Sequence, residues 1–140
     1  MKKQVILSIC GRQRYLDQDP DTIELVTEGT MEFSDGGWDI CYEESELTGL
    51  AGVKTCFRVE NDCILLTRTG KLSSQMVFRE GFSHESLYQM EFGALMIAVC
   101  AKRIIAQLDD HGGMVDLIYS VEIENGVAGE VDYHLDIRTK

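Results

Sequence analysis

Two charged residues of this 140-residue chain, Glu44 and Arg68, occupy positions in alternating segments where they could bind either a ligand or each other. Glu44 continues an alternating apolar segment that begins at Trp38, and Arg68 continues one that begins at Ile64. Because side chains alternate between the two faces of a strand, both charges should point to the apolar side. A charge there is costly unless it is paired, and a guanidinium group matches a carboxylate well. The pattern therefore predicts a small polar group inside an otherwise apolar fold.

Two interpretations of these charges follow. In the first, Arg68 receives the carboxylate or phosphate of a bound ligand, and Thr27 or Tyr88 adds a hydrogen bond. In the second, Glu44 and Arg68 pair with each other and close one end of the fold. We favour the internal pair, since buried charges are usually satisfied within the protein.

Arg103 raises the same question, because it lies in phase with apolar residues of its own segment. It could face inward, or it could lie beyond the rim of the fold, where a long side chain reaches water. A group of apolar residues could line a pocket, although such groups more often belong to a core. That group is Met76, Phe78, Tyr88, Met90 and Phe92. The candidate ligand-binding residues are Thr27, Tyr42, Glu44, Arg68, Met76, Phe78, Tyr88 and Arg103.

No pattern in the chain predicts catalysis or a metal site. His84, His111 and His134 are scattered, without the paired spacing of zinc ligands. The acidic pairs at 43–44 and 109–110 lack the ligand spacing of a calcium loop. A serine or cysteine nucleophile would need a neighbouring base, and the sequence indicates none. We therefore expect no catalytic residue, no metal and no cofactor, and we favour a non-catalytic protein over an enzyme.

The charge of the chain argues against two classes of partner. Its 24 acidic and 13 basic residues give a net charge of −11. Such a surface repels nucleic-acid phosphates and anionic lipid headgroups, so neither nucleic acid nor a membrane is expected as a partner. No segment approaches the roughly 20 apolar residues that span a bilayer. The five cysteines are odd in number and contain no C-x-x-C pair, so we expect all of them to be reduced, in a cytoplasmic protein.

Alternation of apolar and polar residues runs through most of the chain and predicts antiparallel strands. The turns between them are rich in glycine, asparagine and aspartate, and one of them, over 43–52, is dense in glutamate. The predicted strands cover 23–33, 38–43, 53–59, 64–68, 75–79, 87–90, 115–123 and 131–137. A chain of this length and pattern predicts a single domain, 1–140, of the all-β class.

Residues 94–108 do not follow this pattern clearly. Their apolar residues recur at helical spacing, and their composition favours a helix. However, Leu95, Ile97, Val99 and Ala101 also alternate, as they would in a strand. Propensity alone favours the helix.

Several short motifs run in order along nearly the whole chain. They are IELVTEG (23–29), YEESELTG (42–49), RTG (68–70), QMVF (75–78), Tyr88 shortly before Phe92-Gly93, and Gly112-Gly113 before the last hairpin. In this order and spacing they resemble the YwiB-like family of bacterial proteins, which have a calycin-type (lipocalin-like) β-barrel. The resemblance implies that 94–108 form a long strand. It also implies one closed or partly open antiparallel barrel of about eight to ten strands, a size that either is filled by side chains or holds one small ligand.

The family has no established activity, so the resemblance implies a fold and a cytoplasmic setting but no active site. Two functions are consistent with the residues. The first is a non-catalytic barrel that binds a small, partly apolar ligand, which would be anionic if Arg68 is free. The second is a protein-interaction module with a filled barrel, which could form a homodimer. An Arg68→Ala variant separates them, because it should lose ligand in the first case and mainly stability in the second.

Overall fold

A computed structural model of the chain describes residues 2–15, 21–44, 51–90, 93–124 and 126–140, except for the side chains of 15, 88, 90, 127 and 128. Residues 45–50 of the predicted acid-rich turn (43–52), Phe92 and the predicted turn residue Asn125 lie outside the described residues. The described part of the chain forms ten strands. They are β1 (Lys3–Tyr15), β2 (Asp21–Ser34), β3 (Gly37–Glu43), β4 (Val53–Val59), β5 (Ile64–Gly70), β6 (Ser74–Phe78), β7 (Ser83–Met90), β8 (Gly93–Asp109), β9 (Gly112–Ile123) and β10 (Val127–Thr139).

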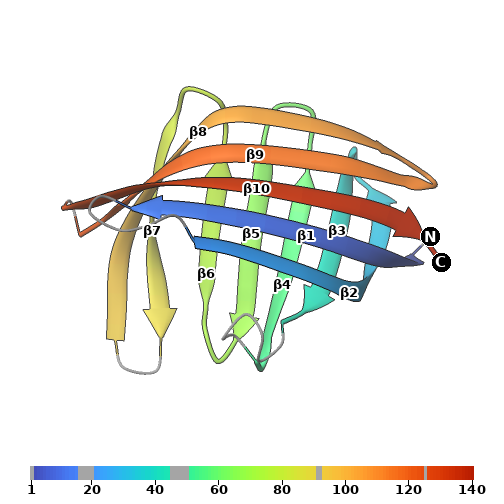
Figure 1. Ribbon diagram of the computed structural model, residues 1–140, viewed down its shortest axis with the longest axis horizontal. Coiled ribbons are helices and arrows are strands. Elements are labelled where there is room, and N and C mark those ends of the chain that lie inside the picture. Colours follow the sequence, from blue (N-terminus) through green and yellow to red (C-terminus); the bar gives the residue numbers. More distant parts are fainter. Residues whose placement is uncertain (1, 16–20, 45–50, 91–92, 125) are drawn as a thin grey trace.

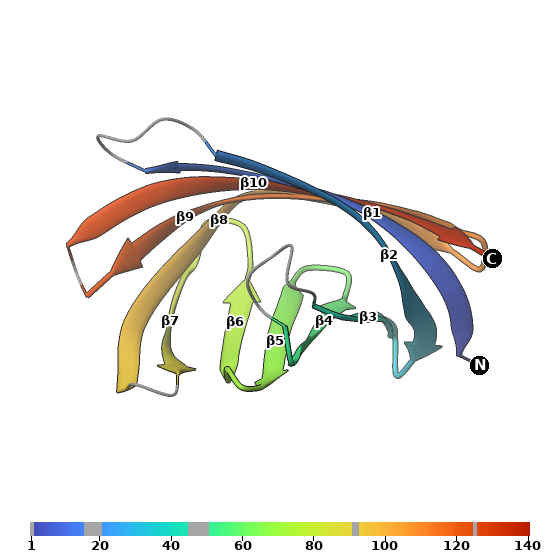
Figure 2. The same cartoon turned by 60° about the horizontal axis from the view of Figure 1, so that its bottom comes forward.

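All ten strands belong to one antiparallel sheet, in the order β6-β5-β4-β3-β2-β1-β10-β9-β8-β7. The strands at the two ends of the chain, β1 and β10, lie side by side (Figure 1). The edge strands β6 and β7 meet where Ser73 and Gln89 exchange backbone hydrogen bonds of 2.9 and 2.8 Å. The sheet therefore curls into a nearly closed barrel, which confirms the predicted all-β barrel. Figure 2 shows the long strands β1, β2, β8, β9 and β10 arching over the shorter strands β3 to β7.

Residues 94–108 lie within the long strand β8, so the strand implied by the resemblance is confirmed and the helix favoured by propensity is wrong. Alternate side chains of β8, at Ile97, Val99 and Ala101, are buried in the barrel. Its backbone pairs with β7 on one side and with β9 on the other. Because this pairing satisfies the backbone and buries one face, tertiary context outweighs a small difference in helix propensity.

The hairpin between β8 and β9 depends on two glycines. Gly112 and Gly113 have φ angles of +116° and +145°, which side chains rarely adopt. A Cβ atom at Gly113 would also collide with the carbonyl oxygen of Gln107 in the neighbouring strand. The Gly-Gly pair therefore allows the chain to reverse between β8 and β9 while the two strands remain paired.

In most strands, alternating residues fill the barrel interior, as their spacing predicted, whereas none of the described side chains of β7 is buried. In β4, for example, Val53, Thr55, Phe57 and Val59 are buried, whereas the residues between them are not. The largest side chains with almost no exposed surface include Phe57, Phe78, Leu7, Met31, Ile40 and Leu117. These core side chains fill one part of the barrel interior. A cavity remains near the end of the barrel where β3 ends and β10 begins.

Two cysteines contradict the prediction that all five are reduced. Cys41 and Cys56 form a disulfide, whereas Cys10, Cys63 and Cys100 are free. The register of β3 and β4 places Cys41 directly opposite Cys56, with their Cα atoms 4.1 Å apart. Residues opposite one another in an antiparallel pair come this close, and a disulfide can join them. Sequence spacing missed the bond because it depends on the register of two strands.

Removing this disulfide is expected to lower the free energy of unfolding by about 3 kcal/mol, because the bond closes a loop of 15 residues in the unfolded chain. Urea unfolding of the Cys41→Ser/Cys56→Ser variant, and of the wild type with and without dithiothreitol, measures this loss. Cys63→Ser is the control, since that thiol is free. A wild-type urea midpoint that does not respond to dithiothreitol would contradict the stabilising role of the bond.

Candidate functional site

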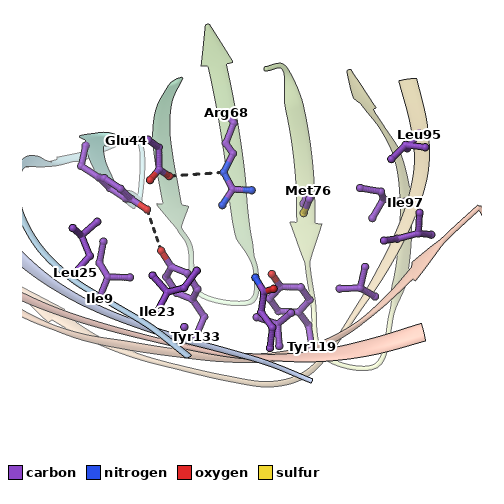
Figure 3. Close-up of a pocket in the computed structure, with 16 residues that line it drawn as sticks. Ile9, Ile23, Leu25, Glu44, Arg68, Met76, Leu95, Ile97, Tyr119 and Tyr133 are labelled. Atoms are coloured by element: carbon purple, nitrogen blue, oxygen red, sulfur yellow. Dashed lines mark hydrogen bonds and ion pairs between the residues drawn. The ribbon is translucent and has the colours of Figure 1, made fainter. Parts of the chain in front are cut away.

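A cavity of about 350 Å³ lies inside the barrel (Figure 3). Its walls are mostly apolar and come from eight of the ten strands or from the residue that follows them. The sixteen lining residues are Ile9, Gly11, Gln13, Ile23, Leu25, Tyr42, Glu44, Arg68, Met76, Leu95, Ile97, Tyr119, Val121, Ile123, Val131 and Tyr133. The β1 residues come from the middle and end of that strand and the β2 residues from its first half, which pair with one another, so these residues lie toward one end of the barrel.

A cluster of polar side chains from β3, β4 and β5 lies at one wall of this cavity. The strand registers align them, since Tyr42 is opposite Thr55 and Thr55 is opposite Arg68. Glu44 follows the end of β3 and is only 8% exposed. Thr55 Oγ1 donates a hydrogen bond of 2.5 Å to Glu44 Oε2. Arg68 Nε lies 4.0 Å from the same Glu44 oxygen, so the two charged residues form an ion pair, as the favoured interpretation predicted.

This ion pair leaves hydrogen-bonding capacity unused. A separation of 4.0 Å is too long for a hydrogen bond between Arg68 Nε and Glu44 Oε2. Neither Arg68 Nε nor Glu44 Oε1 has a hydrogen-bond partner among the residues that the structure describes, although both atoms are buried. Buried polar atoms are usually satisfied, so an unsatisfied donor and acceptor beside a cavity are informative. Figure 3 shows Glu44 and Arg68 pointing toward one another, with Tyr133 approaching from the opposite wall.

Two tyrosines extend the polar cluster across the barrel. The hydroxyls of Tyr42, on β3, and Tyr133, on β10, are 3.1 Å apart and share a hydrogen bond. Burial raises the pKa of Tyr42 to about 12, against the opposing effect of its hydrogen bond to Tyr133. Burial also raises the pKa of Tyr133 well above its usual value. Both hydroxyls therefore stay protonated at neutral pH, and the formal charges of the cavity lining are those of Glu44 and Arg68.

Four of the eight residues predicted to bind a ligand line this cavity. They are Tyr42, Glu44, Arg68 and Met76. Tyr88 belongs to β7, but its side chain is outside the described residues.

The other three predicted residues do not line the cavity. Phe78 is completely buried and packs on Tyr119, with ring centroids 4.5 Å apart, so it supports a lining residue from behind. Thr27 is paired with Leu7, farther along the barrel than the lining residues of the same strands. Arg103 is exposed, which is the second of the two positions considered for it, and a register shift between Ala101 and Arg103 breaks the alternation that would have turned it inward.

Sequence reasoning missed most of the apolar lining. Strand alternation identified Ile23, Leu25, Val121 and Val131 as apolar positions but not their depth in the barrel. Tyr133 was also recognised as part of an alternating segment, without any sign that its hydroxyl meets Tyr42. These contacts join strands that are distant in the sequence.

Comparison with known proteins agrees with this architecture. A family model described as a domain of unknown function (DUF1934) matches residues 7–137. The chain belongs to the DUF1934 family. A relative in Bacillus subtilis (strain 168), named as the uncharacterized beta-barrel protein YwiB, is 30% identical over 82 residues. That alignment covers 59% of this chain and spans only 56% of YwiB.

The crystal structure of the ywiB protein from Bacillus subtilis matches this DUF1934 protein with a TM-score of 0.83. The match covers 96% of this chain and 92% of the crystallised chain, at 23% sequence identity. At this identity the likeness shows the fold. Together these matches confirm the resemblance to YwiB-like β-barrel proteins.

Two further properties concern the described part of the chain. It contains no helix long and apolar enough to cross a membrane. It also contains no group of three or more histidine, cysteine, aspartate or glutamate side chains placed to hold a metal ion.

A separate polar group lies across β9 and β10, away from the cavity lining. His134 Nδ1 is 2.5 Å from Asp116 Oδ1, and His134 Nε2 is 3.0 Å from Asp136 Oδ2. The hydrogen bond with Asp116 raises the pKa of His134, burial opposes this, and Asp136 raises it further. The imidazolium, which can donate to both carboxylates, is therefore favoured in the folded protein.

This arrangement predicts a pH dependence of stability. A histidine whose pKa is higher in the folded state stabilises the protein fully below its unfolded pKa of about 6.5. That contribution is lost as the pH rises through the higher folded value. We expect the melting temperature of the wild type, relative to His134→Gln, to fall as the pH is raised from about 6 to 8. His111→Gln, at an exposed histidine, serves as the control. Wild-type and His134→Gln melting temperatures that stay parallel across this range would contradict the prediction.

Proposed function

We propose that this protein is a non-catalytic barrel that binds one small, partly apolar ligand in its interior cavity. The observation that supports this most directly is the cavity itself, whose 350 Å³ falls within the range of ligand pockets, about 300–1,000 Å³. Such pockets are typically apolar with a few convergent polar groups, and Glu44, Arg68 and the Tyr42–Tyr133 pair form such a group. A barrel of this size can hold one small ligand.

The alternative, an interaction module with a filled barrel, has less support because it requires an interior without such a cavity. Homodimer formation is compatible with either function. The anionic ligand considered from the sequence required a free Arg68, and this arginine is instead paired with Glu44. An enzyme also has less support, because the described lining residues include one carboxylate, already held by Thr55 and Arg68, and no nucleophile beside a base.

A cytoplasmic location is part of the proposal. The free thiols of Cys10, Cys63 and Cys100 support it, whereas a disulfide is uncommon in that compartment. Fractionation of the host cells tests this point. Recovery of the protein with cytoplasmic marker proteins would support the proposal, and recovery outside the cytoplasm would contradict it.

The first experiment is native mass spectrometry of the protein purified from its own host, followed by organic extraction of any bound compound. A discrete adduct of one molecule per chain is expected. A clean mass without an adduct, as monomer or dimer, would contradict the proposal and favour the interaction module.

A matched pair of variants tests whether the ligand occupies this cavity. Leu95 lines the cavity, whereas the adjacent Met96 lies on the other face of β8 and is 37% exposed. Leu95→Trp should fill the space and reduce adduct occupancy by about tenfold or more, while Met96→Trp should retain the adduct. Equal occupancy in both variants would show that the compound binds elsewhere.

A further inference from the structure

The charges at the polar wall restrict the kind of ligand headgroup that the cavity can accept. Glu44 and Arg68 carry the formal charges of the sixteen lining residues, and in the ion pair those charges cancel. A ligand carboxylate beside Arg68 would leave two negative groups near one positive group, whereas a ligand amine would leave two positive groups near one negative group. An extra charge in such a buried site is costly, because none of the other described lining residues carries a charge that would balance it.

The unsatisfied atoms add a second restriction. Glu44 Oε1 is a buried acceptor without a donor, and Arg68 Nε is a buried donor without an acceptor, among the residues described. The other oxygen of Glu44 is already bonded to Thr55, which holds the carboxylate in place. The Glu44 side chain is 2% exposed and that of Arg68 is 17% exposed, so water has limited access to this pair. A ligand that satisfies both atoms needs a donor and an acceptor side by side.

We propose that the cavity selects an uncharged headgroup that presents a hydrogen-bond donor next to an acceptor, as a carboxamide does, attached to an apolar body. The donor meets Glu44 Oε1 and the acceptor meets the Arg68 guanidinium, while the apolar body lies against the wall that contains Leu95 and Ile97 (Figure 3). This inference rests on the proposed function, since it names the ligand class of the same cavity.

A series of probes with one apolar chain and three headgroups tests the inference. Octanamide, octanoate and octylammonium are titrated into the wild-type protein at neutral pH by isothermal titration calorimetry. Octanamide is expected to bind about tenfold more tightly than either charged probe, because it alone satisfies both atoms without adding a charge. Leu95→Trp should weaken the binding of all three probes, and Met96→Trp should weaken the binding of none.

Conservative variants of Glu44 and Arg68 should shift the preference for the charge of the probe headgroup in opposite directions. Glu44→Gln removes the negative charge and keeps a side chain that can accept from Thr55, so octanoate should become the preferred probe by about tenfold. Arg68→Gln removes the positive charge, so octylammonium should become the preferred probe by a similar factor. Circular dichroism and the melting temperature establish that each variant is folded, and the wild-type series decides the question if either is not.

The possible results separate this inference from the proposed function. Octanoate binding as tightly as octanamide to the wild type would overturn the uncharged headgroup and make Arg68 an anion receptor. Equal binding of all three probes, abolished by Leu95→Trp, would overturn the headgroup inference and leave the apolar binding site intact. Absence of binding by all three, together with a protein isolated without an adduct, would overturn the proposed function as well.

Discussion

Replacing Arg68 with alanine is expected to lower the free energy of unfolding by about 3–5 kcal/mol, because it leaves the Glu44 carboxylate buried without its charged partner. For a domain of this length, that loss corresponds to a fall of roughly 10 °C or more in the melting temperature. Urea and thermal unfolding of the variant at neutral pH measure both quantities. Thr55 keeps its hydrogen bond to Glu44 but supplies no charge, so it should not rescue the variant.

Two further variants make this test specific. Lys102 and Glu130 form a shorter ion pair of 2.7 Å, but both side chains are about half exposed. Lys102→Ala should therefore cost only about 0–1 kcal/mol, although its pair has the better geometry. The double variant Glu44→Leu/Arg68→Leu should recover most of the stability that Arg68→Ala loses, because no buried charge remains. A nearly wild-type melting temperature for Arg68→Ala would exclude a structural role for the Glu44–Arg68 pair.

Replacing Phe78 with alanine is expected to cost about 3–5 kcal/mol, because its ring is completely buried and its removal leaves a void in the core. The void would open behind Tyr119, which packs on Phe78 and lines the cavity. The variant should therefore also accept a probe with a longer apolar chain than the wild type does. Urea unfolding measures the first effect, and calorimetric titration with decanamide against octanamide measures the second.

Phe82→Ala is the matched control for Phe78→Ala. Phe82 lies immediately before β7 but is 62% exposed, and the guanidinium carbon of Arg79 lies 5.8 Å from the centroid of its ring. Losing this contact should cost about 0.5–1 kcal/mol, with no change in probe preference. Similar losses for the two variants would mean that Phe78 is not the core residue that its burial indicates.

The inward direction of the key residues could be predicted from the sequence. Glu44 and Arg68 share the parity of apolar neighbours, and the structure places both on the interior side. This inference worked because the period of two in a strand holds wherever the ladder is regular. It could not decide between the two positions considered for Arg103, because a bulge next to Ala101 shifts the register and no residue in that segment marks the bulge.

Distances along and across the barrel could not be predicted in the same way. Thr27 and Phe78 have the expected parity but lie at other depths than the cavity, because the parity of a residue does not give its height on the barrel axis. The Cys41–Cys56 bond was missed for a related reason, since it requires the register of β3 against β4.

The sequence by itself determined that alternating strands form an antiparallel all-β domain, and that Glu44 and Arg68 belong to its inner face. These properties depend on local periodicity, which every segment carries within itself. The local pattern of residues 94–108 favoured a helix, and the strand that the family resemblance implied there was confirmed by the tertiary structure. Only the tertiary structure decided that Tyr133 meets Tyr42 and that the interior keeps a cavity. Those properties depend on pairing and packing between segments far apart in the chain, where small propensities yield to the burial of whole faces and to the satisfaction of backbone hydrogen bonds.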